Sequence, residues 1–524
     1  MSGTIFQPAA KASGSLRRSG PKLLVYLGFL GLVLIGLFLA MVSRGLTDRF
    51  GPAGALALIL GVPLFLAFGF ATFRHCIAQF HEFRKHLTWW HWLWLIMTAS
   101  NFVFRTRDIE TVSENPLDAA AIYRVSLVGL TAFILLLRLV LRRPAWLSSL
   151  FRGLVGIVTV FALTCVLSTI WSVKPPWTFY KSMEYLVDIS LLAIILASAT
   201  TIESYDSLLD WTWVICGALV TIAWIEAPIW PEDALEGSGG YMGGPLQYRL
   251  SGVYPGLGFN MLGTYGAIIG TIAVCRLLPI AGKKFDKLWY SAVLLLGMMT
   301  MVFAQTRSAI GGFVVGVLLV FIFTKRVKFG LMLGAVSAVV VAISGLGSKV
   351  GDFLARGQSA DQLASLSGRV EWWSAAWEAF KLKPLTGYGA FASGMSVFPK
   401  LGVKEITPLH SDYIEVLVGI GIWGPLLILA GLIGTWWVLL RFYRRLPAGS
   451  LERQTLVEAI AVLGVLTVRS TVMGVIMSQP PIQYFAILGY AEYLRRRYVR
   501  GQAPVREAAM SAAASGASQR LSLV

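Results

Sequence analysis

The sequence predicts an all-α polytopic integral membrane protein. Of its 524 residues 56% are hydrophobic and 14% are charged, and the mean hydropathy is +0.69. Apolar stretches recur along the chain, and many of them reach the roughly 20 residues that a helix needs to cross the hydrocarbon of a bilayer. A backbone that faces lipid must satisfy its own hydrogen bonds, so these stretches are expected to be helices.

About fourteen transmembrane helices can be placed in this way. Each is an apolar run that approaches the required length, and the third and the last are the shortest. In chain order the predicted spans cover residues 23–43, 52–72, 89–103, 121–140, 152–171, 183–199, 211–228, 259–279, 289–304, 309–324, 329–347, 411–439, 456–477 and 482–494.

The distribution of Lys and Arg supports this order of spans and predicts their orientation. Basic residues collect in cytoplasmic connections, and here they recur on every second connection except the one near Ser204. Both termini are therefore expected to be cytoplasmic, whereas segments 229–258 and 348–410 are expected outside. The basic connections hold Arg74, Arg84 and Lys85; Arg142, Arg143 and Arg152; Arg276, Lys283, Lys284 and Lys287; Lys325, Arg326 and Lys328; Arg441, Arg444 and Arg445; and Arg495, Arg496, Arg497 and Arg500.

The composition argues against several classes of partner. The net charge of +18 lies in these short connections, which explains the basic pI without nucleic acid. The four cysteines are scattered without C-x-x-C spacing, so neither a disulfide framework nor a zinc site is indicated. The long outer segment 348–410 contains Pro, Gly and aromatic residues, and we expect it to be folded and functional.

His410 is the strongest candidate for chemistry. It ends the long outer segment, whereas the other four histidines lie in or beside one basic connection near the N-terminus. An unperturbed imidazole has a pKa near 6.5 and can accept a proton at neutral pH. Asp412 and Glu415 follow it, and either carboxylate could orient the imidazole or could simply cap or ion-pair the next helix. The alternative for His410 is a structural histidine at the membrane interface.

Three arginines occupy outer connections, where the positive-inside rule does not explain them: Arg249, Arg307 and Arg369. A guanidinium is a planar, permanently charged donor that suits phosphate oxygens. Several of them at the membrane surface would suit a lipid diphosphate. Each could instead be structural: Arg249 could pair with Glu236, Arg369 could pair with Glu371, and any of them could reach lipid headgroups.

Ionisable residues inside apolar runs are also candidates, because charge in a membrane usually faces the bundle interior. Arg469 could support the site or form a buried ion pair, for which Glu415 is a possible partner. Glu184 and Asp188 are four residues apart and could line a polar pocket or a proton path, or serve structural hydrogen bonding. These three residues would also suit a membrane transporter.

The residues around His410 resemble a known family. His410-Ser411, nine further residues, Gly421 and Gly424 match the pattern H-[NSQ]-x9-G-x-x-[GTY] of bacterial O-antigen ligases and related polysaccharide polymerases. The similarity covers most of residues 150–495. Shorter similarities in the same order are Trp171-Ser172-Val173 with Pro175, Thr306-Arg307-Ser308-Ala309, Gly368-Arg369, the Trp372 to Trp377 helix, and Pro384-Leu385-Thr386-Gly387-Tyr388-Gly389.

This resemblance implies a domain organisation. Residues 146–495 would form an O-antigen ligase-like transmembrane domain of GT-C-like glycosyltransferase architecture, with segment 348–410 as its large periplasmic loop. The transmembrane helices in 23–145 would be an N-terminal extension. Residues 1–22 and 496–524 have little to bury and are expected to be disordered in the cytoplasm.

The resemblance also implies a reaction at the periplasmic face of the bacterial inner membrane. It is a metal-independent, inverting transfer of an undecaprenyl-diphosphate-linked glycan to a sugar hydroxyl of lipid A core or of a growing polysaccharide, with no cofactor. His410 would be the base, and Arg249 and Arg307 would hold the diphosphate, with Arg369 as a further loop arginine. An O-antigen or exopolysaccharide polymerase is the nearest alternative, and a protein-targeting oligosaccharyltransferase is a third.

Overall fold

The computed structural model describes residues 88–497, except for residues 101, 103–118, 142–145, 200, 238–247, 281–284, 344–345, most of 356–367, 402–408, 448 and 477–480. The chain divides into two compact units, Met1–Phe80 and His81–Val524, and all described residues belong to the second. The predicted spans 23–43 and 52–72, the predicted disordered N-terminus and residues 498–524 lie outside the described residues.

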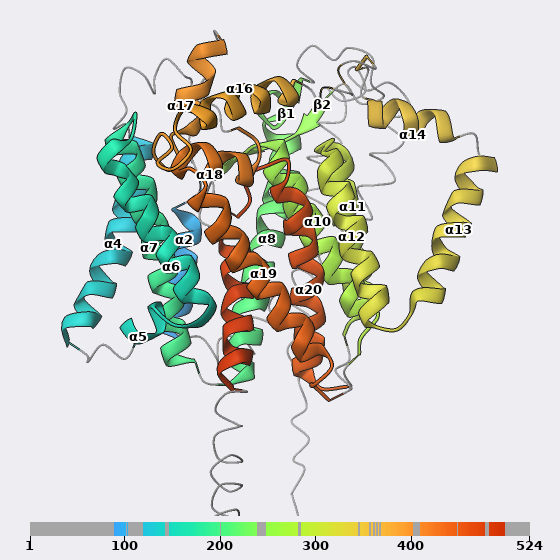
Figure 1. The fold of residues 1–524 in the computed structure, drawn as a ribbon. Coiled ribbons are helices and arrows are strands. Elements are labelled where there is room, and N and C mark those ends of the chain that lie inside the picture. Colours follow the sequence, from blue (N-terminus) through green and yellow to red (C-terminus); the bar gives the residue numbers. More distant parts are fainter. Residues whose placement is uncertain are drawn as a thin grey trace, which may run out of the picture. The chain divides into compact units, whose positions relative to one another are not determined.

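The second unit is a bundle of helices (Figure 1). A helix is found in every predicted span that the structure describes, so the all-α prediction is confirmed there. The labelled helices are α2 (Trp89–Ala99), α4 (Ala119–Leu141), α5 (Leu147–Leu150), α6 (Gly153–Leu167), η1 (Ser168–Trp171), α7 (Pro175–Ser198), α8 (Ile202–Ile229), α9 (Pro231–Ala234), α10 (Phe259–Leu277), α11 (Lys287–Phe303), α12 (Arg307–Phe323), α13 (Val327–Ile343), α14 (Leu346–Ala355), α16 (Arg369–Leu382), α17 (Ser393–Val397), η2 (Phe398–Leu401), α18 (Asp412–Ile420), α19 (Trp423–Tyr443) and α20 (Leu451–Ser470). A further helix covers residues 482–497.

Several of these helices have the character of membrane spans. Among the described residues, four are long and apolar enough to cross a bilayer: 121–141, 153–171, 202–229 and 423–443. Shorter apolar helices are α11, α12 and α13. Large side chains such as Leu331 on α13 and Phe133 on α4 are mostly exposed, which suits a surface that faces lipid rather than water.

Close helix packing depends on glycines, as is common where helices associate in membranes. Gly266 on α10 faces Gly297 on α11. A Cβ at Gly266 would lie 2.9 Å from the Gly297 carbonyl oxygen, and a Cβ at Gly297 would lie 2.6 Å from that of Gly266. Neither position has room for a side chain, so the two backbones approach directly.

Two short β-ribbons, which the sequence did not predict, follow α8. In the first, β1 (Leu235–Gly237) pairs antiparallel with β2 (Tyr248–Leu250), which places Glu236 opposite Arg249. In the second, β3 (Gly252–Val253) pairs with β4 (Gly256–Leu257). The Glu226 carboxylate on α8 accepts hydrogen bonds from the backbone of Val253 and Tyr254 at 2.8 and 2.7 Å. These contacts attach the second ribbon to the end of α8.

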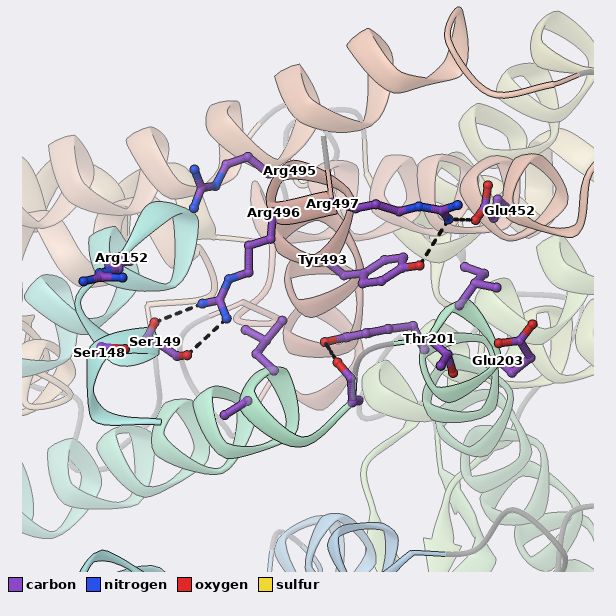
Figure 2. Close-up of a pocket in the computed structure, with 15 residues that line it drawn as sticks. Ser148, Ser149, Arg152, Thr201, Glu203, Glu452, Tyr493, Arg495, Arg496 and Arg497 are labelled. Carbon is purple, nitrogen blue, oxygen red and sulfur yellow. Dashed lines mark hydrogen bonds and ion pairs between the residues drawn. The ribbon is translucent and has the colours of Figure 1, made fainter. Parts of the chain in front are cut away.

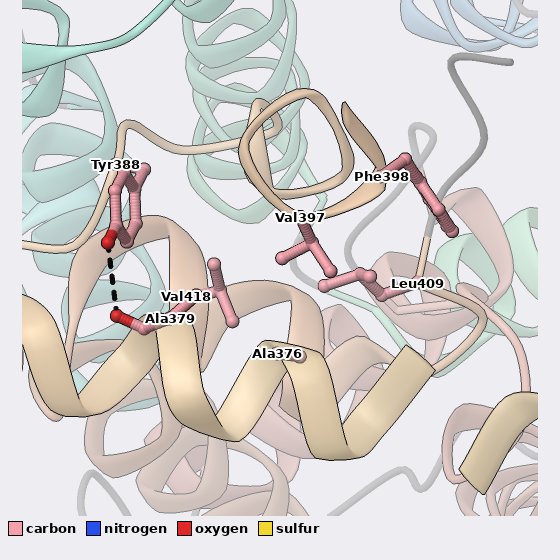
Figure 3. Close-up of a cluster of buried hydrophobic side chains, with 7 residues drawn as sticks. All are labelled: Ala376, Ala379, Tyr388, Val397, Phe398, Leu409 and Val418. Carbon is pink, nitrogen blue, oxygen red and sulfur yellow. Dashed lines mark hydrogen bonds between the residues drawn. The ribbon is translucent and has the colours of Figure 1, made fainter. Parts of the chain in front are cut away.

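The described part of segment 348–410 is folded, as expected, and supplies most of the residues of a small hydrophobic cluster. Figure 3 shows that this cluster lies where α16, α17 and the chain leading into α18 meet. The Tyr388 hydroxyl donates to the Ala379 carbonyl oxygen at 3.1 Å within it. The cluster consists of Ala376, Ala379, Tyr388, Val397, Phe398, Leu409 and Val418.

The span predicted as one helix over 411–439 is two helices, α18 and α19, which are separated at Gly421. This glycine has a positive φ of 70°, which only glycine adopts without strain. A Cβ here would also lie 2.5 Å from the Pro384 carbonyl oxygen. The continuous hydropathy of this stretch conceals the break, because the cause is a steric contact with residues far back in the chain.

Candidate active site

His410 lies two residues before α18 in the chain. Figure 1 shows α16, α17 and α18 at the same end of the bundle. Its imidazole stacks on the ring of Trp372, with centroids 5.7 Å apart and planes at 23°. Trp372 in turn packs edge-on against the ring of Phe398. The backbone of His410 has a φ of +54°, a left-handed conformation that is uncommon for a side-chain-bearing residue and is often found at functional sites.

The residue before His410 is held from two directions. The backbone N–H of Leu409 donates to the Glu415 carboxylate at 3.0 Å, and its carbonyl oxygen accepts from the Trp373 indole at 2.9 Å. Leu409 itself is fully buried. Because its donor, acceptor and side chain are all engaged, the strained conformation of His410 is imposed by its surroundings.

The two carboxylates that follow His410 contact the backbone. Asp412 accepts from the N–H groups of Val475 and Ile476 at 2.9 and 2.8 Å, which ties the start of α18 to the chain after α20. Glu415 holds Leu409 as described. The sequence suggested that these carboxylates orient the imidazole or cap or ion-pair the next helix, whereas these contacts fix the chain on either side of His410.

Arg307 is the first residue of α12. Its guanidinium donates to the Leu354 carbonyl oxygen at 2.9 Å and to the Gln358 side-chain oxygen at 2.8 Å. The turn before it is fixed by Gln305, which has a φ of +50° and donates to the Tyr248 carbonyl oxygen at 2.9 Å. Arg307 is thereby joined both to segment 348–410 and to strand β2.

Arg249 lies next to that contact, because it follows Tyr248 on β2. Its guanidinium sits over the Phe259 ring at 4.1 Å, a distance typical of a cation–π interaction. Phe259 begins α10, and its carbonyl oxygen accepts a hydrogen bond from Thr306 at 3.2 Å. Arg249 and Arg307 are thus attached to the same small group of backbone contacts at the start of α10.

Arg469 is buried near the end of α20, and its partners are neutral. It donates to the Thr264 hydroxyl at 3.0 Å and to the Asn260 carbonyl oxygen at 2.8 Å, and it also hydrogen-bonds Ser308. An ion pair with Glu415 was the expected structural alternative, but the Glu415 carboxylate accepts from Leu409 instead. The hydrogen bonds hold the guanidinium in place without cancelling its charge.

Arg369 connects these groups electrostatically. It begins α16. Its positive charge repels those of Arg307 and Arg469 and disfavours protonation of His410. Within the described part of the chain it has no hydrogen-bond or ion-pair partner. Burial and the charge of Arg307 both lower the pKa of Arg369. Like charges that are gathered and partly desolvated in this way favour binding of an anion.

The same environment determines the protonation of His410. Burial, and to a smaller extent the nearby charge of Arg369, together lower the pKa of His410 to about 4. The imidazole is therefore neutral at neutral pH and can accept a proton. The described residues contain no group of three or more His, Cys, Asp or Glu that could hold a metal ion. The chemistry that this arrangement supports is proton acceptance beside a bound anion.

Glycines and aromatic residues of the motifs quoted above hold the chain in place near His410. The backbone N–H of Tyr388 donates to the Val418 carbonyl oxygen at 3.0 Å, and Gly387 lies too close to Gly419 for a Cβ. The Trp171 indole donates to the Thr386 carbonyl oxygen at 2.7 Å. These contacts dock segment 384–390 between η1 and the end of α18, which positions the helix that follows His410.

Of the residues considered for a transport path, Glu184 forms ion pairs. Lys181 contacts Glu184 at 2.6 Å and Arg124 contacts it at 3.5 Å. These pairs favour the structural interpretation of Glu184. Arg124 lies on α4, and Lys181 and Glu184 lie on α7.

Sequence reasoning missed two contributors to the site. Trp373 was quoted only as part of a helix motif, and its indole contact with Leu409 depends on the fold of the whole segment. Gln358 lies in a stretch without any motif, and only the structure shows that it accepts from Arg307. The pair of adjacent tryptophans could have indicated a role for Trp373, whereas nothing in the sequence around Gln358 indicated one.

Part of the chain matches a known protein family. Residues 291–429 match the family model described as O-antigen ligase, which confirms the resemblance over this part of the chain. The matched region contains Arg307, Arg369 and His410, whereas Arg249 and Arg469 lie outside it. No curated protein matches the sequence.

Proposed function

We propose that the protein is a glycosyltransferase that moves a glycan from a lipid diphosphate to a sugar hydroxyl. The observation that carries the proposal is the buried imidazole of His410, which stacks on Trp372 and lies close enough to Arg369 for that charge to disfavour its protonation. The match of residues 291–429 to the O-antigen ligase family supports the same class of enzyme. A proton acceptor and an anion-binding group are the two components that this transfer requires.

In the proposed reaction His410 is the general base. It removes the proton from the acceptor hydroxyl as the oxygen attacks the anomeric carbon of the donor sugar. The bond between that carbon and the phosphate oxygen breaks, and the lipid diphosphate leaves with the electron pair. Direct displacement inverts the configuration at the anomeric carbon. General-base catalysis of this kind contributes typically 10²–10⁴-fold.

The arginines would hold the donor diphosphate and stabilise its departure. Negative charge develops on the leaving oxygen in the transition state, and guanidinium groups that are already fixed stabilise it without reorganisation. Arg469 is fixed by Thr264 and Asn260, and Arg307 is fixed by Leu354 and Gln358. Because these groups supply the charge compensation, the proposed mechanism uses no metal and no cofactor.

Donor binding would also activate the base. The charge of Arg369 contributes to the lowered pKa of His410, and a bound diphosphate would offset that charge. The pKa of the imidazole should then rise toward its ordinary value, which makes His410 a stronger base only when the donor is present. This coupling would limit proton removal in the absence of substrate.

The preferred substrates are an undecaprenyl-diphosphate-linked glycan and the sugar hydroxyl of lipid A core at the periplasmic face of the bacterial inner membrane. The second candidate is a polymerase of O-antigen or exopolysaccharide repeat units, because the matched family supports ligase and polymerase chemistry alike. Arg249 is included among the proposed diphosphate ligands because it shares the backbone contacts of the Arg307 turn.

The test is the surface-glycan profile of a strain that lacks the protein and is complemented with wild type or with His410→Ala. Lipopolysaccharide and secreted polysaccharide are analysed separately. Loss of long chains from lipid A core, with accumulation of lipid-linked polymer, is expected for a ligase. Accumulation of single repeat units would identify a polymerase instead. Normal glycans in both the deletion strain and the His410→Ala strain would refute the proposed function.

A further inference from the structure

A second polar site lies far from His410. It is a cavity of about 830 Å³. Figure 2 shows the side chains that line it, which come from α5, the residue before α6, the end of α7, the start of α8, the start of α20 and the helix over residues 482–497. Glu452 on α20 lines it, whereas Arg469 is near the opposite end of that same helix. The 17 helical steps from Glu452 to Arg469 correspond to roughly 26 Å of helix, so the two sites are near opposite ends of the bundle.

One carboxylate at the cavity is shared by two guanidinium groups. Glu492 is fully buried and accepts from Arg495 at 2.7 and 2.8 Å and from Arg496 at 2.8 Å. It also accepts from the backbone N–H of Leu154 at 3.1 Å, at the N-terminus of α6. A helix N-terminus carries partial positive charge. Glu492 therefore balances only part of the positive charge around it.

Arg152 adds a further positive charge to the same side of the cavity. It is exposed, it lines the cavity, and its guanidinium has no hydrogen-bond or ion-pair partner within the described residues. Figure 2 places it near Arg495 and Arg496, whereas Arg497 pairs with Glu452 on the other side. Three guanidinium groups thus face this part of the cavity with a single carboxylate among them, which favours an anionic ligand.

The surroundings indicate that the anion comes from a lipid. Phe151, next to Arg152, is 56% exposed, and Leu147 on α5 is also exposed. Leu196 and Ile202 line the cavity beside the polar groups. A basic pocket between helices, with apolar residues at its edge and near the end of a membrane-spanning bundle, is suited to a phosphate-bearing headgroup whose acyl chains lie against the outside of the bundle.

We infer that this cavity binds the phosphate of an anionic lipid from the leaflet at the end of the bundle opposite His410. Arg152, Arg495 and Arg496 are the residues that would contact the phosphate. Glu203 lines the same cavity and is exposed, so it weakens binding by repulsion. The site is independent of the transfer reaction, because none of these residues belongs to the His410 site.

The experiment uses the purified full chain in detergent after lipid removal. Phosphatidylglycerol, phosphatidylcholine or inorganic phosphate is added, and bound lipid is measured by native mass spectrometry together with the unfolding midpoint. Wild type should retain phosphatidylglycerol in preference to phosphatidylcholine. Arg152→Gln should weaken that binding roughly fivefold, the effect of losing one arginine near an anionic membrane surface. Glu203→Gln should strengthen it.

Arg444→Gln is the matched control, because Arg444 is an exposed arginine at the C-terminal end of α19 and does not line the cavity. Its lipid binding should equal that of wild type. Equal binding of both lipids would overturn the inference, as would equal loss in Arg152→Gln and Arg444→Gln. A midpoint shift with inorganic phosphate as large as that with phosphatidylglycerol would also overturn it, since the ligand would then be a soluble anion.

Discussion

The environment of His410 determines when its imidazole can accept a proton. Burial is the larger cause of its lowered pKa, and the charge of Arg369 is the second. A base must be deprotonated to act, so activity is lost as the pH falls through this pKa. For the free protein that loss should occur near pH 4, well below the value of 6.5 for an unperturbed histidine.

Arg369→Gln should move the acid limb of kcat/KM to higher pH. Removing the guanidinium removes one cause of the lowered pKa of His410, so the imidazole becomes protonated at a higher pH than in wild type. The measurement is a pH–rate profile of transfer by the purified protein, in which kcat/KM reports the pKa of the free enzyme.

Lys381→Gln is the control for this variant. It removes one positive charge from the same helix, but Lys381 is half exposed and pairs with Glu378. Its acid limb should coincide with that of wild type. An acid limb in Arg369→Gln at the wild-type pH would show that Arg369 does not act on the group that titrates.

Arg307→Lys should lower kcat/KM by roughly tenfold or more, because a lysine cannot present two parallel donors to phosphate oxygens. Arg307 also holds Gln358, so loss of that contact must be separated from loss of phosphate binding. Gln358→Ala removes the contact and keeps the guanidinium. Equal rates in the two variants would show that Arg307 acts only by holding segment 348–410.

At the scale of elements, α16 and α18 position the base through the backbone of Leu409. Trp373→Phe should lower kcat by up to roughly tenfold, the effect of one lost hydrogen bond, because it removes the indole N–H that the Leu409 carbonyl oxygen accepts. KM for the donor should stay unchanged, since the arginines are intact. Trp377→Phe on the same helix, where Trp377 is 52% exposed, should leave both constants unaltered. A rise in KM with an unchanged kcat would contradict this positioning role.

The junction of α18 and α19 depends on Gly421. Gly421→Ala should destabilise the protein by roughly 1–3 kcal/mol, the range for a side chain forced into a left-handed conformation, and its Cβ would also press on the Pro384 carbonyl oxygen. The apparent Tm should fall by several degrees. Gly311→Ala on α12 is the control, since no atom lies within 4 Å of a Cβ there. An unchanged Tm in Gly421→Ala would show that the junction can adjust.

The helices were predictable from sequence because their apolar runs reflect a local requirement of a membrane environment. The break within 411–439 and the β-ribbons after α8 were not, since neither changes the hydropathy of the chain. The break arises from contact between Gly421 and Pro384, and the first ribbon is defined by the register of Glu236 with Arg249. Such contacts depend on how distant segments pack.

At the scale of the whole molecule, the candidate site is assembled from segments that are far apart in the sequence. His410, Arg307 and Arg369 were predictable because each occurs in a motif whose residue types imply a chemistry. The place of Arg469 was not predictable, because its hydrogen bonds to Ser308 and Thr264 exist only when α20 packs against α10 and α12. The sequence offered Glu415 as a possible partner of Arg469, whereas in the fold the Glu415 carboxylate accepts a hydrogen bond from the Leu409 N–H.

In the proposed mechanism His410 acts in the transfer step, whereas the arginines bind the donor, so donor binding and turnover should respond differently to the loss of His410. The most direct measurement compares donor binding and transfer rate for wild type and His410→Ala, with the purified full chain and a lipid-diphosphate-linked glycan. Donor affinity should be retained while kcat falls by roughly 10²–10⁴-fold. Wild-type turnover in His410→Ala would contradict the role of His410 as base, and loss of donor affinity equal to the loss of turnover would show that it binds the donor instead.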